Sequence, residues 1–226
     1  YPDGPGILFE LIQNADDAKA TEVRFLLNKR TYKSSSLLGP QMGAWQGPAL
    51  YSYNDAMFTP SDFQHLSQIG QGSKLDRLGA TGRFGLGFNA VYHFTDVPSL
   101  VSADSVVIFD PHTSYLPGAT LRQPGLKINF TSPISSLHQQ FPDQFEPYLL
   151  YGCNLRTKFN GTLFRFPLRN EVTVKKSQIK HDPSSVEDVL ALFQSFKLVA
   201  NDALLFLRNV RRVEVQVCDE AGVITT

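Results

Sequence analysis

The 226-residue sequence has few cysteines, the residues that form the disulfides of small secreted folds and that often bind metal ions. Its 2 Cys, at positions 153 and 218, lie too far apart for any common metal-ligand spacing. Two isolated thiols in a chain of this length favour a reducing compartment, and we expect a cytoplasmic location. No apolar run approaches the ~20 residues that a membrane-spanning helix needs, so we expect no membrane insertion.

The sequence also lacks an excess of charge of either sign. Lys and Arg total 21, Asp and Glu also total 21, and the formal net charge is +0. Proteins that bind nucleic acid through their overall field carry an excess of basic residues, so we expect no nucleic-acid partner. Apolar residues are abundant: 42% of the residues are hydrophobic and 17 are Phe. This composition predicts a well-packed core. We expect one domain over residues 1–226.

The order of the periodic segments predicts an α+β fold. Alternating apolar residues indicate strands at 21–27, 49–53, 99–102, 105–109, 126–130, 162–168 and 210–217. Helical spacing and capping residues indicate helices at 7–19, from 60, from about 85 to 94, within 141–150, and from 185 to 199. Several strands follow one another, with helices before and after them. This order favours a mixed, mostly antiparallel sheet with helices on one face.

The first helix, within the stretch LFELIQNADDA, has an unusual polar face. At ~100° per residue, Glu10, Asn14 and Asp17 fall within an arc of roughly 60°. This face has two carboxylates and an amide but no interleaved cation. It is either an ordinary solvated face or a site where a carboxylate takes a proton from water and an amide oxygen binds Mg²⁺.

Two further segments have a site-like composition. Residues 79–88 (GATGRFGLGF) contain glycines leading into a predicted helix, where free N–H groups bind anions; a flexible loop with close helix packing is the alternative. Asp55 follows the predicted strand at 49–53 and is either a turn residue or an acceptor for an exocyclic amine.

The joint order of these segments resembles the GHKL ATPase superfamily. Its first box matches Glu10, Asn14 and Asp17, and its second glycine box matches the segment around Gly85. The stretch IGQGSK resembles the lid entry of the chaperone members, and NGTLF resembles the late strand that places a Thr beside the base. The resemblance covers about residues 6–168 and implies a two-layer α/β sandwich, the Bergerat fold.

The resemblance implies a role for each matching residue. Glu10 would be the catalytic base for the attacking water, and Asn14 would hold Mg²⁺. The ATP or ADP cofactor would be contacted by Asn14, Asp17, Asp55, Lys74, Gly82, Gly85, Gly87, Phe88 and Thr162. Asp55 would accept from the adenine amine, helped by Thr162.

The sequence departs from the family at the base-binding box, which normally reads D-x-G-x-G. Met57 and Thr59 stand where glycines allow close approach to the base. Met57 either packs in the core, which we expect, or fills the space of the purine. In either case the loop must follow a different course past the base, and ordinary nucleotide affinity is in question.

Two functions follow from the resemblance. One is a chaperone-type switch driven by Mg-ATP and Mg-ADP; at most this is a weak ATPase that needs downstream segments. The other is a pseudo-ATPase that serves as an interaction scaffold. In both cases the implied partners are client or co-chaperone proteins and the neighbouring repeat segments of a larger protein.

Overall fold

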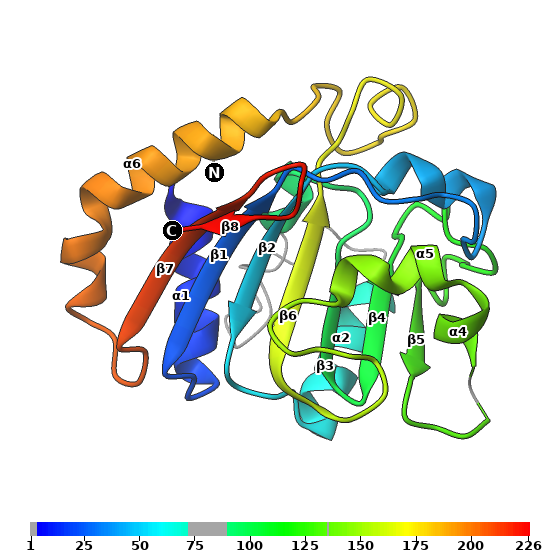
Figure 1. Cartoon of the computed structure of the whole chain (residues 1–226), viewed down its shortest axis with the longest axis horizontal. Coiled ribbons are helices and arrows are strands. Elements are labelled where there is room, and N and C mark those ends of the chain that lie inside the picture. Colours follow the sequence, from blue (N-terminus) through cyan, green and yellow to red (C-terminus); the bar gives the residue numbers. More distant parts are fainter. Residues whose placement is uncertain (1–3, 72–89, 135) are drawn as a thin grey trace.

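Eight strands form a single twisted sheet in the computed structural model, which describes residues 4–71, 90–134 and 136–226 (Figure 1). The strand order is β5-β4-β3-β6-β2-β1-β7-β8. Seven of the eight coincide with predicted segments: β1 (Glu22–Asn28), β2 (Ala49–Asn54), β3 (Ser99–Ala103), β4 (Ser105–Phe109), β5 (Gly125–Asn129), β6 (Phe159–Pro167) and β7 (Arg212–Cys218). The two-residue strand β8 (Ile224–Thr225) was not predicted.

The sheet is antiparallel except between β1 and β7. These two strands are parallel over their full length, with Glu22 opposite Arg212 and Asn28 opposite Cys218. The pair β2 and β6 is antiparallel and places Asn54 opposite Thr162. The predicted mixed, mostly antiparallel sheet is therefore confirmed.

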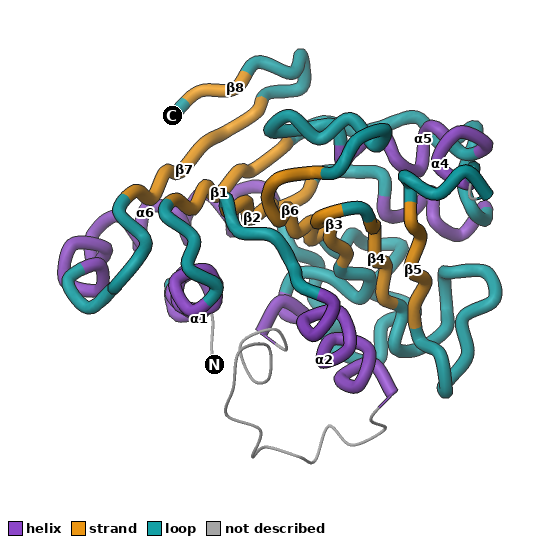
Figure 2. The backbone as a smooth tube through the Cα atoms, turned by 90° about the horizontal axis from the view of Figure 1, so that it is seen from below, coloured by secondary structure: helices purple, strands orange, loops and turns teal. Residues whose placement is uncertain are grey.

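Three long helices cover one face of the sheet (Figure 2). They are α1 (Gly6–Asp17), α2 (Pro60–Gln71) and α6 (Val186–Leu204). A reciprocal capping box begins α6, in which the Ser185 hydroxyl accepts from the Asp188 N–H and the Asp188 carboxylate accepts from the Ser185 N–H. Thr59 and Asp62 make the same exchange at the start of α2. Of the helix predicted from about 85 to 94, the described part is the 3-10 helix η2 (Ala90–His93).

The opposite face is covered by short helical turns rather than by long helices. These are η1 (Pro40–Trp45), α4 (Leu137–Gln140), α5 (Pro142–Phe145) and η3 (Glu146–Tyr148). Trp45 is 1% exposed and packs edge-on against Tyr115. The segment around Trp45 and the helical segment predicted within 141–150 therefore form a second covering layer.

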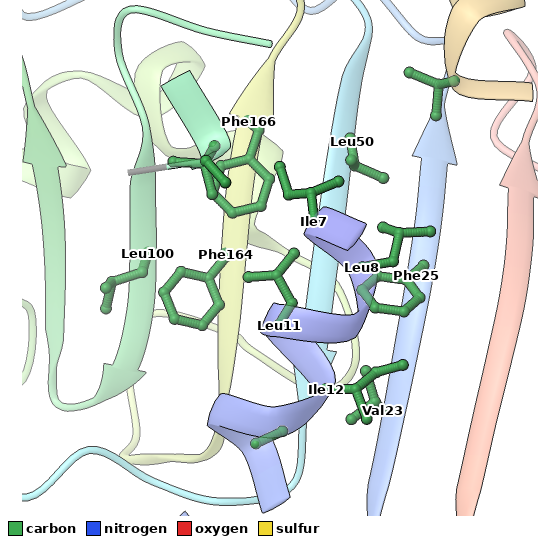
Figure 3. Close-up of a cluster of buried hydrophobic side chains, with 14 of the residues drawn as sticks. Ile7, Leu8, Leu11, Ile12, Val23, Phe25, Leu50, Leu100, Phe164 and Phe166 are labelled. Carbon is green, nitrogen blue, oxygen red and sulfur yellow. The ribbon is translucent and has the colours of Figure 1, made fainter. Parts of the chain in front are cut away.

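The sheet is buried on both sides because its strands are apolar at successive positions. Val23, Phe25 and Leu27 of β1 point to the helix face, while Leu26 between them packs on the opposite face. On the helix face, the side chains of α1 meet those of the central strands (Figure 3). In that cluster Leu11 of α1 lies beside Phe164 of β6 (Figure 3). This packing fixes α1 over the ends of β2 and β6, where the candidate site lies.

Candidate functional site

A small pocket lies between the C-terminal half of α1, the end of β2 and the start of β6. Its walls are formed by Leu11, Asn14, Ala15, Ala18, Asn54, Ala56, Phe58, Asp62, Thr162 and Phe164. The structure thus brings two of the predicted residues, Asn14 and Thr162, to one place. The cavity volume is about 10 Å³, which is room for a single water molecule.

Glu10 lies one helical turn before Asn14 on α1. Its Oε2 atom is buried and has no hydrogen-bond partner among the described residues. Burial raises the pKa of this carboxyl group, because desolvation disfavours the charged form. A buried carboxylate oxygen without a partner, one turn from an amide side chain, is the arrangement expected where a water molecule or Mg²⁺ is bound.

Asp55 is turned away from this pocket and capped by the start of β1. Its Oδ1 accepts from the backbone N–H groups of Thr21 and Glu22 at 2.7 and 3.2 Å, and its Oδ2 accepts from the Thr21 hydroxyl at 2.5 Å. Burial would raise the pKa of Asp55, but these hydrogen bonds outweigh it and lower the pKa. Asp55 does not line the pocket; its neighbour Asn54 does.

Thr162 lines the pocket, and its hydroxyl group is already engaged. This hydroxyl donates to the Ala56 carbonyl at 2.7 Å and shares a 2.8 Å hydrogen bond with the Ser102 hydroxyl. Ser102 in turn accepts from the Phe58 N–H at 2.9 Å. These hydrogen bonds hold the β2-to-α2 connection against β3 and β6.

The two adjacent aspartates of α1 have different surroundings. Asp17, the predicted site residue, is exposed. Asp16 is 8% exposed, and its carboxylate accepts from three consecutive backbone N–H groups at residues 208–210. Burial acts to raise the pKa of Asp16, but the hydrogen bonds prevail and lower it. Asp16 therefore holds α1 to the segment that leads into β7, a role that the sequence reading missed.

The residues at the two expected glycine positions do not occupy the pocket. Met57 is 39% exposed, so the prediction that it packs in the core is wrong. The chain turns at Asn54, whose Oδ1 accepts from the Ala56 N–H, and this turn directs Met57 outward. Thr59 is exposed and caps α2. Both side chains are accommodated because Met57 is exposed to solvent and Thr59 caps a helix.

The predicted phosphate-binding residues lie outside the described chain. These are Lys74, Gly82, Gly85, Gly87 and Phe88. The residues that follow them are firmly held. Arg169, with no exposed surface, contacts Asp96 at 2.6 Å and donates to the Tyr92 and His93 carbonyls at 2.6 and 2.9 Å. This buried ion pair fixes η2 against the end of β6.

The described residues fit the two ends of a magnesium nucleotide unequally. At the metal end, the free oxygen of Glu10 and the amide of Asn14 have the donor chemistry that Mg²⁺ requires. At the base end, the carboxylate of Asp55 accepts three hydrogen bonds from Thr21 and Glu22, and the cavity holds about one water molecule. The base end therefore does not fit an adenine in this structure.

This arrangement defines a class of fold: an α+β sandwich, in which a helix with acidic and amide side chains packs on a mostly antiparallel sheet beside the ends of two paired strands. A family model described as "Sacsin domain" matches residues 1–224. Human Sacsin is 42% identical over 228 residues, covering 98% of this chain and 5% of the human protein. The chain belongs to the sacsin family.

The chain spans about 5% of the length of the human relative that it matches. Among solved structures, the N-terminal domain of a DNA repair protein is similar over 100% of this chain and 51% of that chain, with 8% identity and a TM-score of 0.46. A similarity at that level carries no information about ligands or activity.

Two further observations concern metal ligands and helix length in the described part of the chain. No group of three or more His, Cys, Asp or Glu residues in it is placed to hold a metal ion. In the same residues, no helix combines the length and apolar character needed to cross a membrane.

Proposed function

We propose that this chain is a protein-interaction module of a sacsin-family protein, of the chaperone type, built on a nucleotide-binding fold whose base end is closed. The observation that supports it is the position of Asp55. The carboxylate that would receive an adenine amine instead accepts three hydrogen bonds from Thr21 and Glu22. Displacing them would leave two backbone N–H groups unpaired at the start of β1, at a cost of about 1–3 kcal/mol for each that is buried.

The proposed partners are client or co-chaperone proteins and neighbouring segments of the parent protein. The balanced charge, with 21 residues of each sign, gives no support for a nucleic-acid partner. The proposed location is cytoplasmic. It is supported by the two cysteines, which are both buried and unpaired.

A second candidate function is a switch driven by Mg-ATP and Mg-ADP. It is favoured by the buried, unpartnered Oε2 of Glu10 beside Asn14. For nucleotide to enter, the segment from Ala56 to Thr59 would have to move away from Ser102 and Thr162, to which it is now bonded. Under this second function we propose that the domain alone is at most a weak ATPase and that turnover needs segments beyond this chain.

Isothermal titration calorimetry with Mg-ATP and Mg-ADP separates the two functions. The interaction module predicts no binding heat at millimolar nucleotide by a chain whose circular dichroism shows it to be folded. Binding that is lost in both Asn14→Ala and Asp55→Asn would establish the switch and overturn the module. Under the switch, Glu10→Ala would leave binding nearly unchanged and abolish turnover in a longer protein.

A matched variant tests the physical reason for the closed base end. Thr21→Ala removes the hydroxyl that holds Oδ2 of Asp55 and leaves the backbone of β1 intact. If the capping of Asp55 keeps nucleotide out, this variant should bind more tightly than the parent. Thr120→Ala, in an exposed turn far along the chain, is the control for loss of a hydroxyl.

A further inference from the structure

Two segments that are far apart in the sequence meet beside the start of β1 and β7. The first is the α1–β1 corner, residues 16–22, and the second is the β7 entry, residues 208–212 (Figure 1). The Asp16 carboxylate accepts from the backbone N–H groups of residues 208–210, at 3.1, 2.6 and 2.8 Å. The Thr21 carbonyl accepts from those of Arg211 and Arg212, at 2.8 and 3.3 Å. Two residues of the α1–β1 corner therefore bind all five consecutive N–H groups of the β7 entry.

The α1–β1 corner is a tight turn closed by its own hydrogen bonds. The Lys19 N–H donates to the Asp16 carbonyl, and the Ala20 N–H donates to the Ala15 carbonyl, both at 2.9 Å. This is the Schellman pattern, in which the left-handed residue is usually glycine. Here that residue is Lys19, with a φ of 63°. Such a conformation persists only where the surrounding structure fixes it, and it recurs at switch regions. We therefore expect the corner to move as one body.

The α1–β1 corner also adjoins both walls of the α1 pocket. On the α1 side, Ala15 and Ala18 line the pocket directly before the turn. On the β2 side, the pocket residue Ala56 follows Asp55 in the chain. The Asp55 carboxylate accepts from the Thr21 N–H at 2.7 Å and from the Thr21 hydroxyl at 2.5 Å. One wall is therefore connected to the β7 entry through the end of α1, and the other wall through Thr21.

We propose that the α1–β1 corner is a conformational joint that couples the walls of the α1 pocket to the β7 entry. When Asp55 is released from Thr21, the Thr21 carbonyl loses its fixed position, and the N–H groups that it accepts become free. Loss of the Asp16 carboxylate acts in the opposite direction, from the β7 entry toward Thr21. Such coupling is reciprocal by thermodynamic necessity. A partner of any kind that displaces either wall would therefore change the connection from α6 to β7.

The alternative is that the strand pair β1 and β7 holds the β7 entry without help from the corner. These strands are paired over their full length, beginning with Glu22 opposite Arg212. In that case, a change at Asp55 would affect Thr21 and leave the β7 entry as it is. In the described chain, Asp16 and Asp55 have no hydrogen-bond partner in common. An effect of one on the partners of the other would therefore have to pass through the corner.

Amide hydrogen exchange of the folded chain, followed residue by residue by NMR, separates the two possibilities. Asp55→Ala removes an acceptor of Thr21 and Glu22 that contacts no residue of the β7 entry. If the joint is real, exchange of the amides at 208–212 should become faster by on the order of tenfold. The amides of β4, in the other half of the sheet, should exchange as in the parent.

Asp143→Ala is the matched control. The Asp143 carboxylate accepts from the backbone N–H groups of Ser35 and Ser36 at 2.8 and 2.9 Å. It lies in α5, on the opposite face of the sheet. The control removes the same chemical group and also leaves two backbone N–H groups without their acceptor. It should speed exchange at Ser35 and Ser36 and leave the β7 entry unchanged.

The reverse experiment starts from Asp16. Asp16→Ala should speed exchange of the Thr21 and Glu22 amides, although Asp16 is not their acceptor. Asp17→Ala, at the exposed neighbouring position, should not. If Asp16→Ala does not fold, Asp16→Asn, which keeps one acceptor oxygen, allows the same comparison. The double variant with Asp55→Ala should lose less stability than the two single variants added together, because either change alone already opens the joint.

Three outcomes would overturn the proposal. One is a folded Asp55→Ala chain whose amides at 208–212 exchange at the rate of the parent. Another is equal acceleration in β4, which would indicate a general loss of stability rather than coupling. The third is strict additivity in the double variant. No ligand is added in these measurements, so their failure would leave the calorimetric test of the proposed function untouched.

Discussion

Asp96→Asn removes the carboxylate that faces the Arg169 guanidinium in the interior. In the parent chain, the Arg169 Nε and Nη2 atoms lie 2.7 and 2.6 Å from Asp96 Oδ1. The Ser177 hydroxyl also donates to that oxygen, at 3.1 Å. Side-chain exposure is 0% for Arg169 and 3% for Asp96, so water cannot replace the lost charge.

The expected loss of stability is large because the variant leaves a buried cation without its counter-ion. Breaking one partner of such a pair costs about 3–5 kcal/mol. For a domain of 226 residues, a loss of that size lowers the melting temperature by on the order of 10 °C. Because Arg169 also holds the Tyr92 and His93 carbonyls, the loss should be accompanied by faster amide exchange around η2.

Thermal and urea unfolding followed by circular dichroism measure the effect. Asp182→Asn is the control, since Asp182 is exposed and carries the same chemical change. A double variant, Asp96→Asn with Arg169→Met, should lose less than the two single variants added together. If Asp96→Asn costs no more than the control, the ion pair does not have the role that its geometry implies.

Three further predictions concern α1 and the start of β6. Asp16→Asn should cost about 1–3 kcal/mol, whereas Asp17→Asn at the exposed neighbour should be nearly neutral in urea unfolding. Because the pKa of Asp16 is lowered in the folded state, Asp16 contributes its full share of folding stability above the ordinary pKa of 3.8. This contribution is lost as the pH falls through the lowered pKa, so acidification should reduce the stability of Asp16→Asn less than that of the parent. The pKa of Glu10 is shifted in the opposite direction, upward, so its charged form destabilises the folded state. Glu10→Gln should therefore be more stable than the parent at neutral pH, and this difference in stability should vanish below the ordinary pKa of 4.5. A parent chain that matches or exceeds Glu10→Gln at pH 7 would contradict the desolvation argument. Gly161→Ala should destabilise by about 1–3 kcal/mol, because its Cβ would lie 2.8 Å from the Tyr53 ring; unchanged melting would refute it.

Periodicity located most of the elements because it reflects local burial. The alternation of β1 and the apolar stripe of α1 both correspond to the helix-face core. The capping residues of α2 and α6 marked where those helices begin. The short strand β8 has only two residues and no alternation to read, so it depends on its pairing with β7.

The site was only partly predictable because its hydrogen bonds join distant segments. In the pair Asp16 and Asp17, helical geometry selects Asp17 for the polar face, but the acceptor that organises the fold is Asp16, through N–H groups more than 190 positions away. The same holds for Asp55, since nothing near it in the sequence indicates that Thr21 will occupy its carboxylate. The local sequence pattern predicts the face of the helix on which a side chain lies. The role of that side chain depends on hydrogen-bond partners that are distant in the sequence.

The parallel pairing of β1 with β7 has a consequence for how the domain is made. Strand β1 ends at Asn28, and its outer neighbour begins at Arg212. During synthesis the ribosome must therefore release the residues up to about Cys218 before β1 can gain its second neighbouring strand. Until then the nascent chain keeps an apolar strand unprotected, and an emerging fragment that stops before residue 212 should depend on holding factors to stay out of aggregates.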